Sequence, residues 1–272
     1  MKVILMGTSS WVVPVFDRAA GEHEIAAVFT RAPKPAGRRH ELQKSPVHTW
    51  AEEKGLPVYT SIKQFDTVDT SDIAVIIVAS YGVILRDNVL NAARLGCINI
   101  HPSDLPKYRG PAPMAAAVYN GDTESAVCVM RVAAEVDAGD IFIRKKFPIG
   151  ENDTIADVEK RVGVMASEML SEFLASPESF PPQEQLGEPT FTRKWTNDDE
   201  LIDWNKTPFE IHNQIRSIGG RTKINGIDVK ILKITIEDGK LKIENIQPAG
   251  KRPMPWRDFV NGQRGKLISF GD

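Results

Sequence analysis

The 272-residue sequence predicts an α/β protein with a mostly parallel sheet, helices on both of its faces, and a small β-rich C-terminal domain. Apolar runs of strand length alternate with stretches of helical periodicity, which is typical of parallel sheets joined by crossover helices. The runs VILM and IAVIIVA are apolar on successive residues, as in strands that are covered on both faces. After residue 206, two strand-like runs flank Glu237-Asp238-Gly239, a hairpin signal that predicts a separate β-rich module.

The elements of the main body follow from these patterns. Strands are predicted at residues 3–6, 24–30, 73–80, 97–100, 125–133 and 141–149. Helices are predicted at residues 13–20, 46–54, 87–95, 111–120 and 154–174, the last with Asn152 or Asp153 as its N-cap. Residues 175–190 hold four prolines and little periodicity, which indicates a linker.

These elements predict two domains. The main domain spans residues 1–188, a linker region covers 175–205, and the β-rich C-terminal domain spans 206–272. In the C-terminal domain we predict a helix at 207–218 and strands at 228–236, 240–246 and 265–269. This domain carries 13 Lys and Arg against 7 Asp and Glu, whereas the chain as a whole has a net charge of −2. The uneven charge suits a polyanionic partner or an ordinary solvated basic face.

The composition argues against a membrane protein, a secreted disulfide-rich protein and a metalloprotein. No run of about 18 apolar residues exists, so we expect no membrane span, and the first residues lack the length of a signal peptide. Cys97 and Cys128 lie in apolar runs without metal or redox spacing, which predicts buried side chains and a cytoplasmic protein. The five histidines are scattered, so we expect no metal site.

One set of polar residues lies where strands end. Asn99 and His101 are two apart at the end of a predicted strand, so their side chains share a face. Asp137 follows the next predicted strand, in the turn VDAGD. Because ligands of open α/β sheets bind beyond the carboxyl ends of the strands, we expect these three side chains to meet. Taken singly, the histidine suits a hydrogen-bonded core residue and the turn suits a plain connector.

An amide, an imidazole and a carboxylate together suit attack by an amine on an acyl or formyl carbon. Asn99 can donate a hydrogen bond to the developing oxyanion, and so can His101 when it is protonated. Asp137 would favour that protonated form and can collect the proton of the amine. Other chemistries lack their signals: the sequence has no G-x-G-x-x-G after the first strand, no P-loop, no H-E-x-x-H and no G-x-S-x-G.

The segments INIHPSDLPKYRG and VDAGD resemble the folate-dependent formyltransferases, whose core pattern is N-x-H, then S-L-L-P, then D-x-G. Asp104 stands where that family usually has leucine. The resemblance covers nearly the whole chain and is strongest to the members that formylate methionyl-tRNA. It includes FTRAPKPAGRRHELQKSPV, EEKGLPV, YGVIL and IQPAGKRPM. It implies a Rossmann-like N-terminal domain, a small C-terminal β-barrel and 10-formyltetrahydrofolate as the formyl donor.

The resemblance also implies roles for individual residues. Asn99, His101 and Asp137 match the catalytic residues of the family. The folate-binding positions are matched by Ser103, Asp104, Leu105, Pro106, Tyr81, Gly82, Ile84, Leu85, Glu135 and Val136. The positions that touch tRNA are matched by Arg31, Lys34, Arg38, Arg39 and Lys44, to which Lys251 and Arg252 add a basic track on the second module.

The expected partners are therefore folate and methionyl-tRNA, with no membrane, and we expect a monomer. Two other functions fit the same residues. The first is formylation of an amino sugar on a sugar nucleotide, by the same catalytic trio. The second is binding of folate or RNA without catalysis, against which the intact Asn99, His101 and Asp137 argue.

Overall fold

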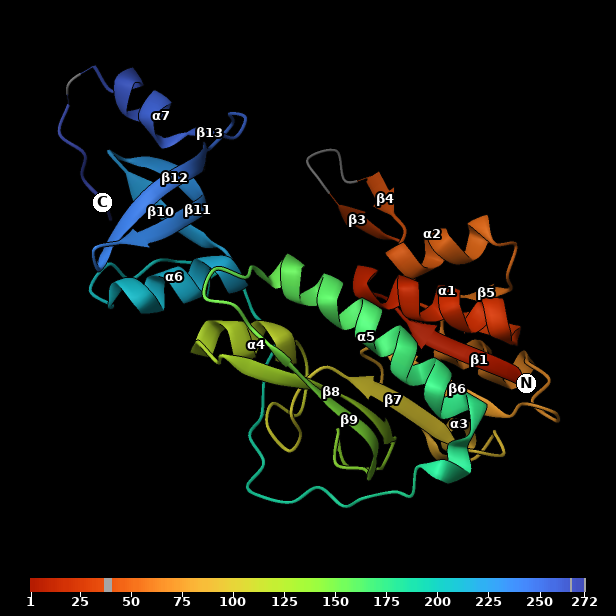
Figure 1. Ribbon diagram of the computed structural model, residues 1–272. Coiled ribbons are helices and arrows are strands. Elements are labelled where there is room, and N and C mark those ends of the chain that lie inside the picture. Colours follow the sequence, from red (N-terminus) through yellow and green to blue (C-terminus); the bar gives the residue numbers. More distant parts are fainter. Residues whose placement is uncertain (37–40, 265, 272) are drawn as a thin grey trace. The chain divides into compact units, whose positions relative to one another are not determined.

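The computed structural model describes residues 1–36, 41–264 and 266–271 (Figure 1). The chain forms two compact units, and each is built from several segments. The first unit comprises Met1–Pro111, Ala126–Phe147 and Glu159–Phe191. The second unit comprises Ala112–Ser125, Pro148–Val158 and Thr192–Asp272. The division into domains at 1–188 and 206–272 is not settled by these units and stays a prediction.

A seven-stranded sheet organises the first unit, in the order β5-β2-β1-β6-β7-β8-β9. The strands are β1 (Lys2–Gly7), β2 (Glu24–Phe29), β5 (Val58–Tyr59), β6 (Val75–Ala79), β7 (Cys97–His101), β8 (Glu124–Arg131) and β9 (Ile141–Pro148). Each neighbouring pair from β5 to β7 is parallel, and β8 runs antiparallel to β7. The predicted mostly parallel sheet is confirmed. From β1 the chain adds β2 and β5 on one side and then β6 and β7 on the other, and sheets of this kind bind ligands at such a switch point.

Both faces of this sheet are covered. In β1, Ile4 and Met6 pack in one core cluster with residues of β2 and β6, while Val3 and Leu5, which point to the other face, are also fully buried. Gly7 ends β1 without a side chain because a Cβ there would lie 2.7 Å from the carbonyl oxygen of Ala79. The predicted continuous apolar strands therefore have the burial expected of them.

Helices and short 3-10 segments join the strands. They are η1 (Ser10–Val12), α1 (Val13–Glu22), α2 (Pro46–Glu53), η2 (Ile62–Thr67), α3 (Asp87–Leu90), α4 (Pro113–Asn120), α5 (Ile155–Ala175) and η3 (Pro177–Ser179). In Figure 1, α5 runs beside α1, and side chains of α1 bond to Ser171 of α5. A separate hairpin joins β3 (Lys34–Ala36) to β4 (Glu41–Gln43).

One predicted helix is too long, and one predicted strand does not form. The helix expected at 87–95 ends at Leu90, because the backbone N–H groups of Arg94 and Leu95 donate to the carbonyls of Ile73 and Ala74 instead of continuing the helix. The strand expected at 265–269 does not form over 266–269, where the backbone N–H of Ser269 donates to the side chain of Asn225. Residue 265 lies outside the described residues.

The second unit contains the predicted β-rich module. Its four-stranded antiparallel sheet has the order β10-β11-β12-β13, with α6 and α7 packed on it. The elements are α6 (Pro208–Ser217), β10 (Gly220–Ile224), β11 (Ile227–Glu237), β12 (Lys240–Pro248), β13 (Met254–Pro255) and α7 (Trp256–Gly262). The hairpin turn between β11 and β12 has positive φ at Asp238 and Gly239, as the EDG signal predicts.

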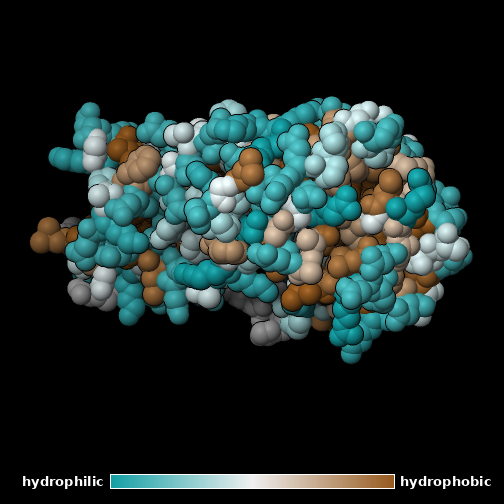
Figure 2. Space-filling model, turned by 90° about the horizontal axis from the view of Figure 1, so that it is seen from below, coloured by the Kyte–Doolittle hydropathy of each residue, from teal (hydrophilic) through white to brown (hydrophobic). Residues whose placement is uncertain are grey.

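Hydrophilic side chains cover most of the face seen in Figure 2, with small hydrophobic patches among them. Within the described residues, the structure has no helix with the length and apolar character needed to cross a membrane. Cys97 and Cys128 are free and buried, as predicted.

Candidate active site

Strand β7 delivers Asn99 and His101 to the carboxyl end of the sheet. The two side chains lie on the same face of the strand because they are two residues apart. His101 is 4% exposed, and its Nε2 lies 3.0 Å from the backbone carbonyl oxygen of Tyr108. A carbonyl oxygen only accepts, so Nε2 must carry a hydrogen and donate it. The other ring nitrogen, Nδ1, faces the carboxylate of Asp137.

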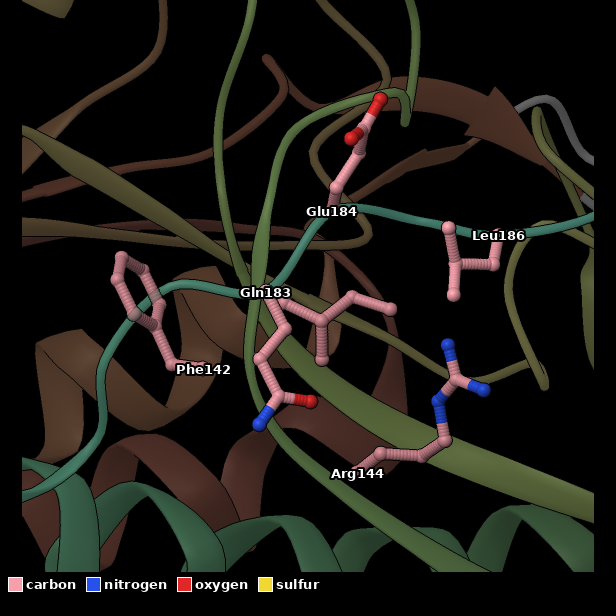
Figure 3. A pocket seen from close by; sticks show the side chains of 6 residues that line it. Phe142, Arg144, Gln183, Glu184 and Leu186 are labelled. Atoms are coloured by element: carbon pink, nitrogen blue, oxygen red, sulfur yellow. The ribbon is translucent and has the colours of Figure 1, made fainter.

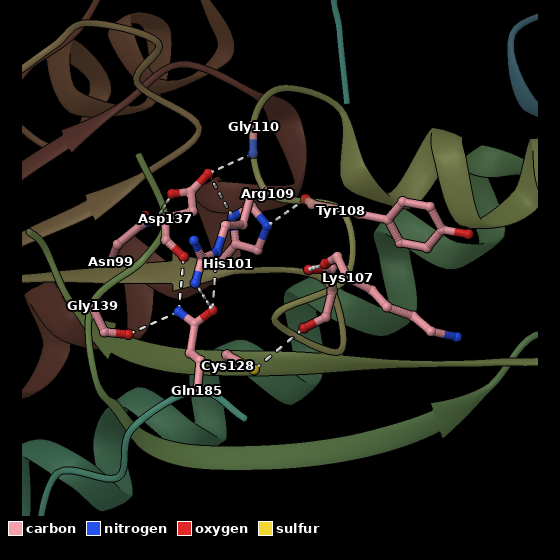
Figure 4. Close-up of polar contacts among 11 residues, drawn as sticks. Asn99, His101, Lys107, Tyr108, Arg109, Gly110, Cys128, Asp137, Gly139 and Gln185 are labelled. Atoms are coloured by element: carbon pink, nitrogen blue, oxygen red, sulfur yellow. Dashed lines mark hydrogen bonds and ion pairs between the residues drawn. The ribbon is translucent and has the colours of Figure 1, made fainter. Parts of the chain in front are cut away.

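Asp137 reaches this position from the turn that follows β8. Its Oδ1 accepts a hydrogen bond from Asn99 Nδ2 at 3.2 Å, and its Oδ2 accepts one from the backbone N–H of Gly110 at 2.8 Å. The same Oδ2 lies 3.5 Å from His101 Nδ1. The structure therefore brings together the three residues predicted from the sequence (Figure 4).

The turn that carries Asp137 has an unusual backbone. Asp137 itself has a φ of +51°, a left-handed value that Asp and Asn tolerate better than most residues. At Gly139, a Cβ would lie 2.0 Å from the carbonyl oxygen of Arg131. Local geometry thus explains the D-x-G pattern. The left-handed backbone at Asp137 directs its side chain toward β7, and the missing side chain of Gly139 lets the chain pass close to β8.

Burial and charge act in opposite directions on His101. Burial lowers the pKa of His101 because it disfavours the charged imidazolium, while the Asp137 carboxylate and the Tyr108 carbonyl oppose that change. With Nε2 protonated, a neutral ring has no hydrogen on Nδ1 and cannot donate to Asp137. A direct hydrogen bond across this contact therefore requires one further proton, carried either by His101 or by Asp137.

Buried side chains and a hydrogen bond from β9 fix the loop at residues 103–110 to the sheet. Ser103 Oγ donates to the carbonyl oxygen of Lys107 at 2.6 Å, and Leu105 is fully buried in a cluster with Cys128. The carboxylate of Asp104 lies 3.3 Å from Arg144 Nη1, while Arg144 Nη2 donates to the carbonyl oxygen of Leu105. The side chain of Leu105 thus anchors the loop, and any ligand would meet this segment through its backbone and its exposed neighbours.

The other positions assigned to folate lie on two loops. Tyr81, Gly82, Ile84 and Leu85 follow β6, and Glu135 with Val136 follows β8. Burial raises the pKa of Tyr81 to about 12, so its hydroxyl stays protonated at neutral pH.

Both loops expose apolar side chains. Ile84 is 83% exposed and Val136 is 55% exposed, although both are aliphatic. Exposed aliphatic residues on the two loops beside β7 suit the face of a flat heteroaromatic ring. The chemistry of these residues therefore fits a pterin.

The predicted tRNA-contacting residues are in part described. Arg31 and Lys34 are exposed at and before β3, while Arg38 and Arg39 lie outside the described residues. Lys44 Nζ bonds to Glu52 at 2.6 Å, which offsets its charge. Lys251 and Arg252 are exposed in the second unit, between β12 and β13.

Several residues at the site were missed by sequence reasoning. The backbone groups of Tyr108 and Gly110 bond to His101 and Asp137, and Gln185 reaches the turn from the segment predicted as a linker. Gln185 had no sequence signal, because its contacts are to loop backbone. Arg109 bonds both Glu135 and Gln185.

A pocket of about 220 Å³ lies on β9 and the segment after α5 (Figure 3). Its lining comprises Ile141, Phe142, Arg144, Gln183, Glu184 and Leu186. None of the predicted catalytic residues is among them. Within the described part of the chain, no group of three or more His, Cys, Asp and Glu residues is arranged to hold a metal ion.

Comparison with known proteins assigns the family. Residues 1–174 match the family model described as formyl transferase. Methionyl-tRNA formyltransferase of Rickettsia bellii (strain RML369-C) is 31% identical over 301 residues, covering 99% of each chain. Among solved structures, WlaRD, a sugar 3N-formyl transferase, covers 93% of this chain at 20% identity and a TM-score of 0.69. Methionyl-tRNA formyltransferase from Clostridium thermocellum covers 91% at 17% identity and a TM-score of 0.64. The chain therefore belongs to the formyl transferase family.

Proposed function

We propose that the chain transfers a formyl group from 10-formyltetrahydrofolate to the α-amino group of initiator methionyl-tRNA. The observation that carries the chemistry is the meeting of Asn99, His101 and Asp137 at the carboxyl end of β7. The Rickettsia relative, which is matched along its full length and is named for methionyl-tRNA, supports the choice of acceptor.

The folate would supply an activated formyl carbon. It would be held between the loop after β6 and the loop after β8, where Ile84 and Val136 are exposed. A solved protein of the same fold was crystallised in the presence of 5-N-formyl-THF, which supports a formylated folate as the donor. Residues 103–106 would border the site, with Ser103 and Leu105 holding the loop from inside.

Each catalytic side chain then has a defined task as the amine attacks and a tetrahedral intermediate forms. Asn99 Nδ2 donates one hydrogen to Asp137, which leaves the second to stabilise the developing oxyanion. The Asp137 carboxylate accepts the proton of the attacking amine, directly or through water. Collapse of the intermediate would break the bond between the formyl carbon and the folate nitrogen, and that nitrogen would take up the proton that Asp137, held beside His101, received from the amine.

The acceptor assignment is tested by formyl transfer to several amines. We expect turnover with initiator methionyl-tRNA and none with uncharged tRNA, which lacks the α-amine. Nucleotide-linked amino sugars provide the competing acceptor. Activity on the sugars alone would replace this proposal with an amino-sugar formyltransferase, and binding of folate with no transfer to either acceptor would indicate a catalytically silent protein.

The basic hairpin would supply part of the tRNA affinity. Arg31, Lys34, Arg38, Arg39 and Lys44 belong to the sequence segment 31–44, and charged contacts with phosphates make binding dependent on salt. Replacing Arg38 and Arg39 together by alanine should weaken binding and flatten the dependence of log K on log salt by roughly 0.7–0.9 for each phosphate that is no longer neutralised. The double variant Lys145→Ala with Lys160→Ala, on β9 and α5, is the matched control. An unchanged slope in the Arg38 and Arg39 variant would remove the hairpin from the tRNA interface.

A further inference from the structure

The segment after α5 reads as a proline-rich linker in the sequence but is bonded to the candidate active site. The backbone of Gln183 exchanges two hydrogen bonds with Ile141 of β9, at 2.8 and 2.9 Å. Further along, Thr190 bonds to the loop at three points. Its Oγ1 accepts from Tyr108 N, its carbonyl oxygen accepts from Arg109 N, and its own N–H donates to the Pro106 carbonyl oxygen. Residues 183–190, called the strap below, are therefore attached to β9 at one end and to the loop at residues 103–110 at the other.

Between these two attachments, the side chain of Gln185 turns inward (Figure 4). Its Nε2 donates to the carbonyl oxygens of Asp137 and Gly139, each at 2.8 Å. Its Oε1 accepts from Arg109 Nε at 3.1 Å and from Arg109 Nη2 at 2.9 Å. An amide has two N–H donors and an oxygen with two lone pairs, so all four of its hydrogen-bonding positions are used. A flipped amide would set oxygen against two carbonyls, so the network also fixes its orientation.

The turn held by Gln185 has little support of its own. Inside residues 135–139, the backbone makes one long bond, from Ala138 N to the Glu135 carbonyl at 3.4 Å. Asp137 sits at a positive φ, and Gly139 passes close to β8. The turn's own hydrogen bonds leave its backbone loosely defined. The two hydrogen bonds from Gln185 Nε2 to the carbonyl oxygens of residues 137 and 139 therefore fix it.

Arg109 extends this arrangement to the loop. Its guanidinium accepts no bonds and donates to Gln185, while Nη1 donates to Glu135 at 3.1 Å. Arg109 follows Tyr108, whose carbonyl oxygen receives the Nε2 hydrogen of His101. The strap thus contacts the surroundings of both Asp137 and His101. Gln185 binds the turn that carries Asp137, and Thr190 binds Tyr108, whose carbonyl oxygen accepts from His101.

We propose that Gln185, which the strap carries into the active site, is the positioning residue that aims the Asp137 carboxylate at Asn99 and His101. This inference rests on the proposed catalytic role of Asp137. Gln185 does not touch the reacting atoms. It acts by holding the backbone on which Asp137 is mounted, so its loss should reduce kcat rather than substrate affinity.

Two replacements separate this role from simple packing. Gln185→Ala removes all four hydrogen bonds. Gln185→Glu keeps the size of the side chain and the acceptor for Arg109 but replaces the two donors with oxygen, which repels the two carbonyls. The control is Gln183→Ala, which changes the same residue type in the same segment, where the side chain is exposed and its backbone bonds to Ile141 remain.

We expect kcat for formyl transfer to fall about 10- to 100-fold in both Gln185 variants, since a displacement of about 1 Å costs that order of rate. The KM for the formyl donor should stay within about threefold, and Gln183→Ala should match the wild type. Hydrogen exchange gives a readout free of activity: the amides of Ala138 and of Gly110, which donates to Asp137 Oδ2, should exchange faster in the Gln185 variants and at the wild-type rate in Gln183→Ala.

The outcomes separate this inference from the function on which it rests. A wild-type protein that formylates no amine would defeat the proposed function. If the wild type is active and Asp137→Ala is not, while both Gln185 variants keep kcat within twofold and turn exchange is unchanged, only the positioning role is overturned. Should the Gln185 variants fail to fold, Arg109→Met decides. This change deletes both donors to Gln185 Oε1, and a wild-type kcat with unchanged turn exchange in the folded variant would overturn the positioning role.

Discussion

Replacing Asp137 by asparagine changes the charge of the site with little change in shape. Asparagine tolerates the left-handed φ of +51° at this position, so the turn can keep its backbone. The difference lies in the hydrogen bonds. Both carboxylate oxygens of Asp137 accept, one from Asn99 Nδ2 and one from Gly110 N. Asparagine offers one oxygen and one NH₂, so either Gly110 faces a donor or Asn99 must turn its own NH₂ away from the site.

The size of the effect follows from the lost base and the lost acceptor. A positioned general base contributes about 10²- to 10⁴-fold to a rate. We therefore expect kcat of Asp137→Asn to fall by about 10²- to 10⁴-fold, equivalent to about 3–5 kcal/mol in the activation barrier. The KM for the formyl donor should change little, because the Asp137 carboxylate faces Asn99, Gly110 and His101.

Single-turnover formyl transfer measures the chemical step directly, since it excludes product release. Asp140→Asn is the matched control, because it makes the same chemical change three residues away. Thermal unfolding of both variants establishes that they are folded. If folded Asp137→Asn transferred formyl within threefold of the wild-type rate, neither a base nor an acceptor at Asp137 would be part of the mechanism.

Three further predictions concern stability and the loop. Burial lowers the pKa of His101 below 6.5, so on acidification the unfolded chain takes up a proton at this residue at a higher pH than the folded chain does. The free energy of unfolding should therefore fall as the pH drops below about 6.5. Urea titrations at pH 7.5 and 5.5 should show a smaller fall for His101→Gln than for the wild type. Gly139→Ala should lower the midpoint of thermal unfolding sharply or prevent folding, because its Cβ would lie 2.0 Å from a carbonyl oxygen; a wild-type midpoint would contradict this. Asp104→Leu should cost about 1 kcal/mol or less in urea unfolding, since its ion pair with Arg144 is partly exposed, and a larger loss would show that the carboxylate holds the loop.

The sequence was sufficient for features that repeat along it or lie next to one another. Strands β1 and β6 are apolar on successive residues because both faces of the sheet are covered, and this pattern needs no knowledge of partners. Asn99 and His101 share a face through the period of a strand. The turn with Asp137 follows the neighbouring strand β8, but β8 runs antiparallel to β7 and ends beside Ile98, so the chain after Arg131 must return along β7 before Asp137 meets Asn99 and His101.

The remaining features depend on contacts between distant segments. The helix predicted at 87–95 stops at Leu90 because Ile73 and Ala74 offer carbonyls that a local pattern does not reveal. Gln185 lies 48 residues after Asp137 in sequence and binds carbonyl oxygens, which every residue has. A side chain whose partners are backbone groups leaves no mark in composition or spacing, so the linker interpretation was the only one the sequence offered.

The structure also separates the roles proposed for Asn99, His101 and Asp137. The sequence suggested that Asn99 and a protonated His101 both donate to the oxyanion. In the structure, Nε2 of His101 donates to the Tyr108 carbonyl, and Nδ1 faces Asp137, so neither ring nitrogen is free of the protein. Asn99 differs, because one hydrogen of its Nδ2 is held by Asp137 and the other is still available. The amide is thus the preorganised donor, and burial lowers the pKa of His101 and so disfavours the imidazolium that would be the second donor.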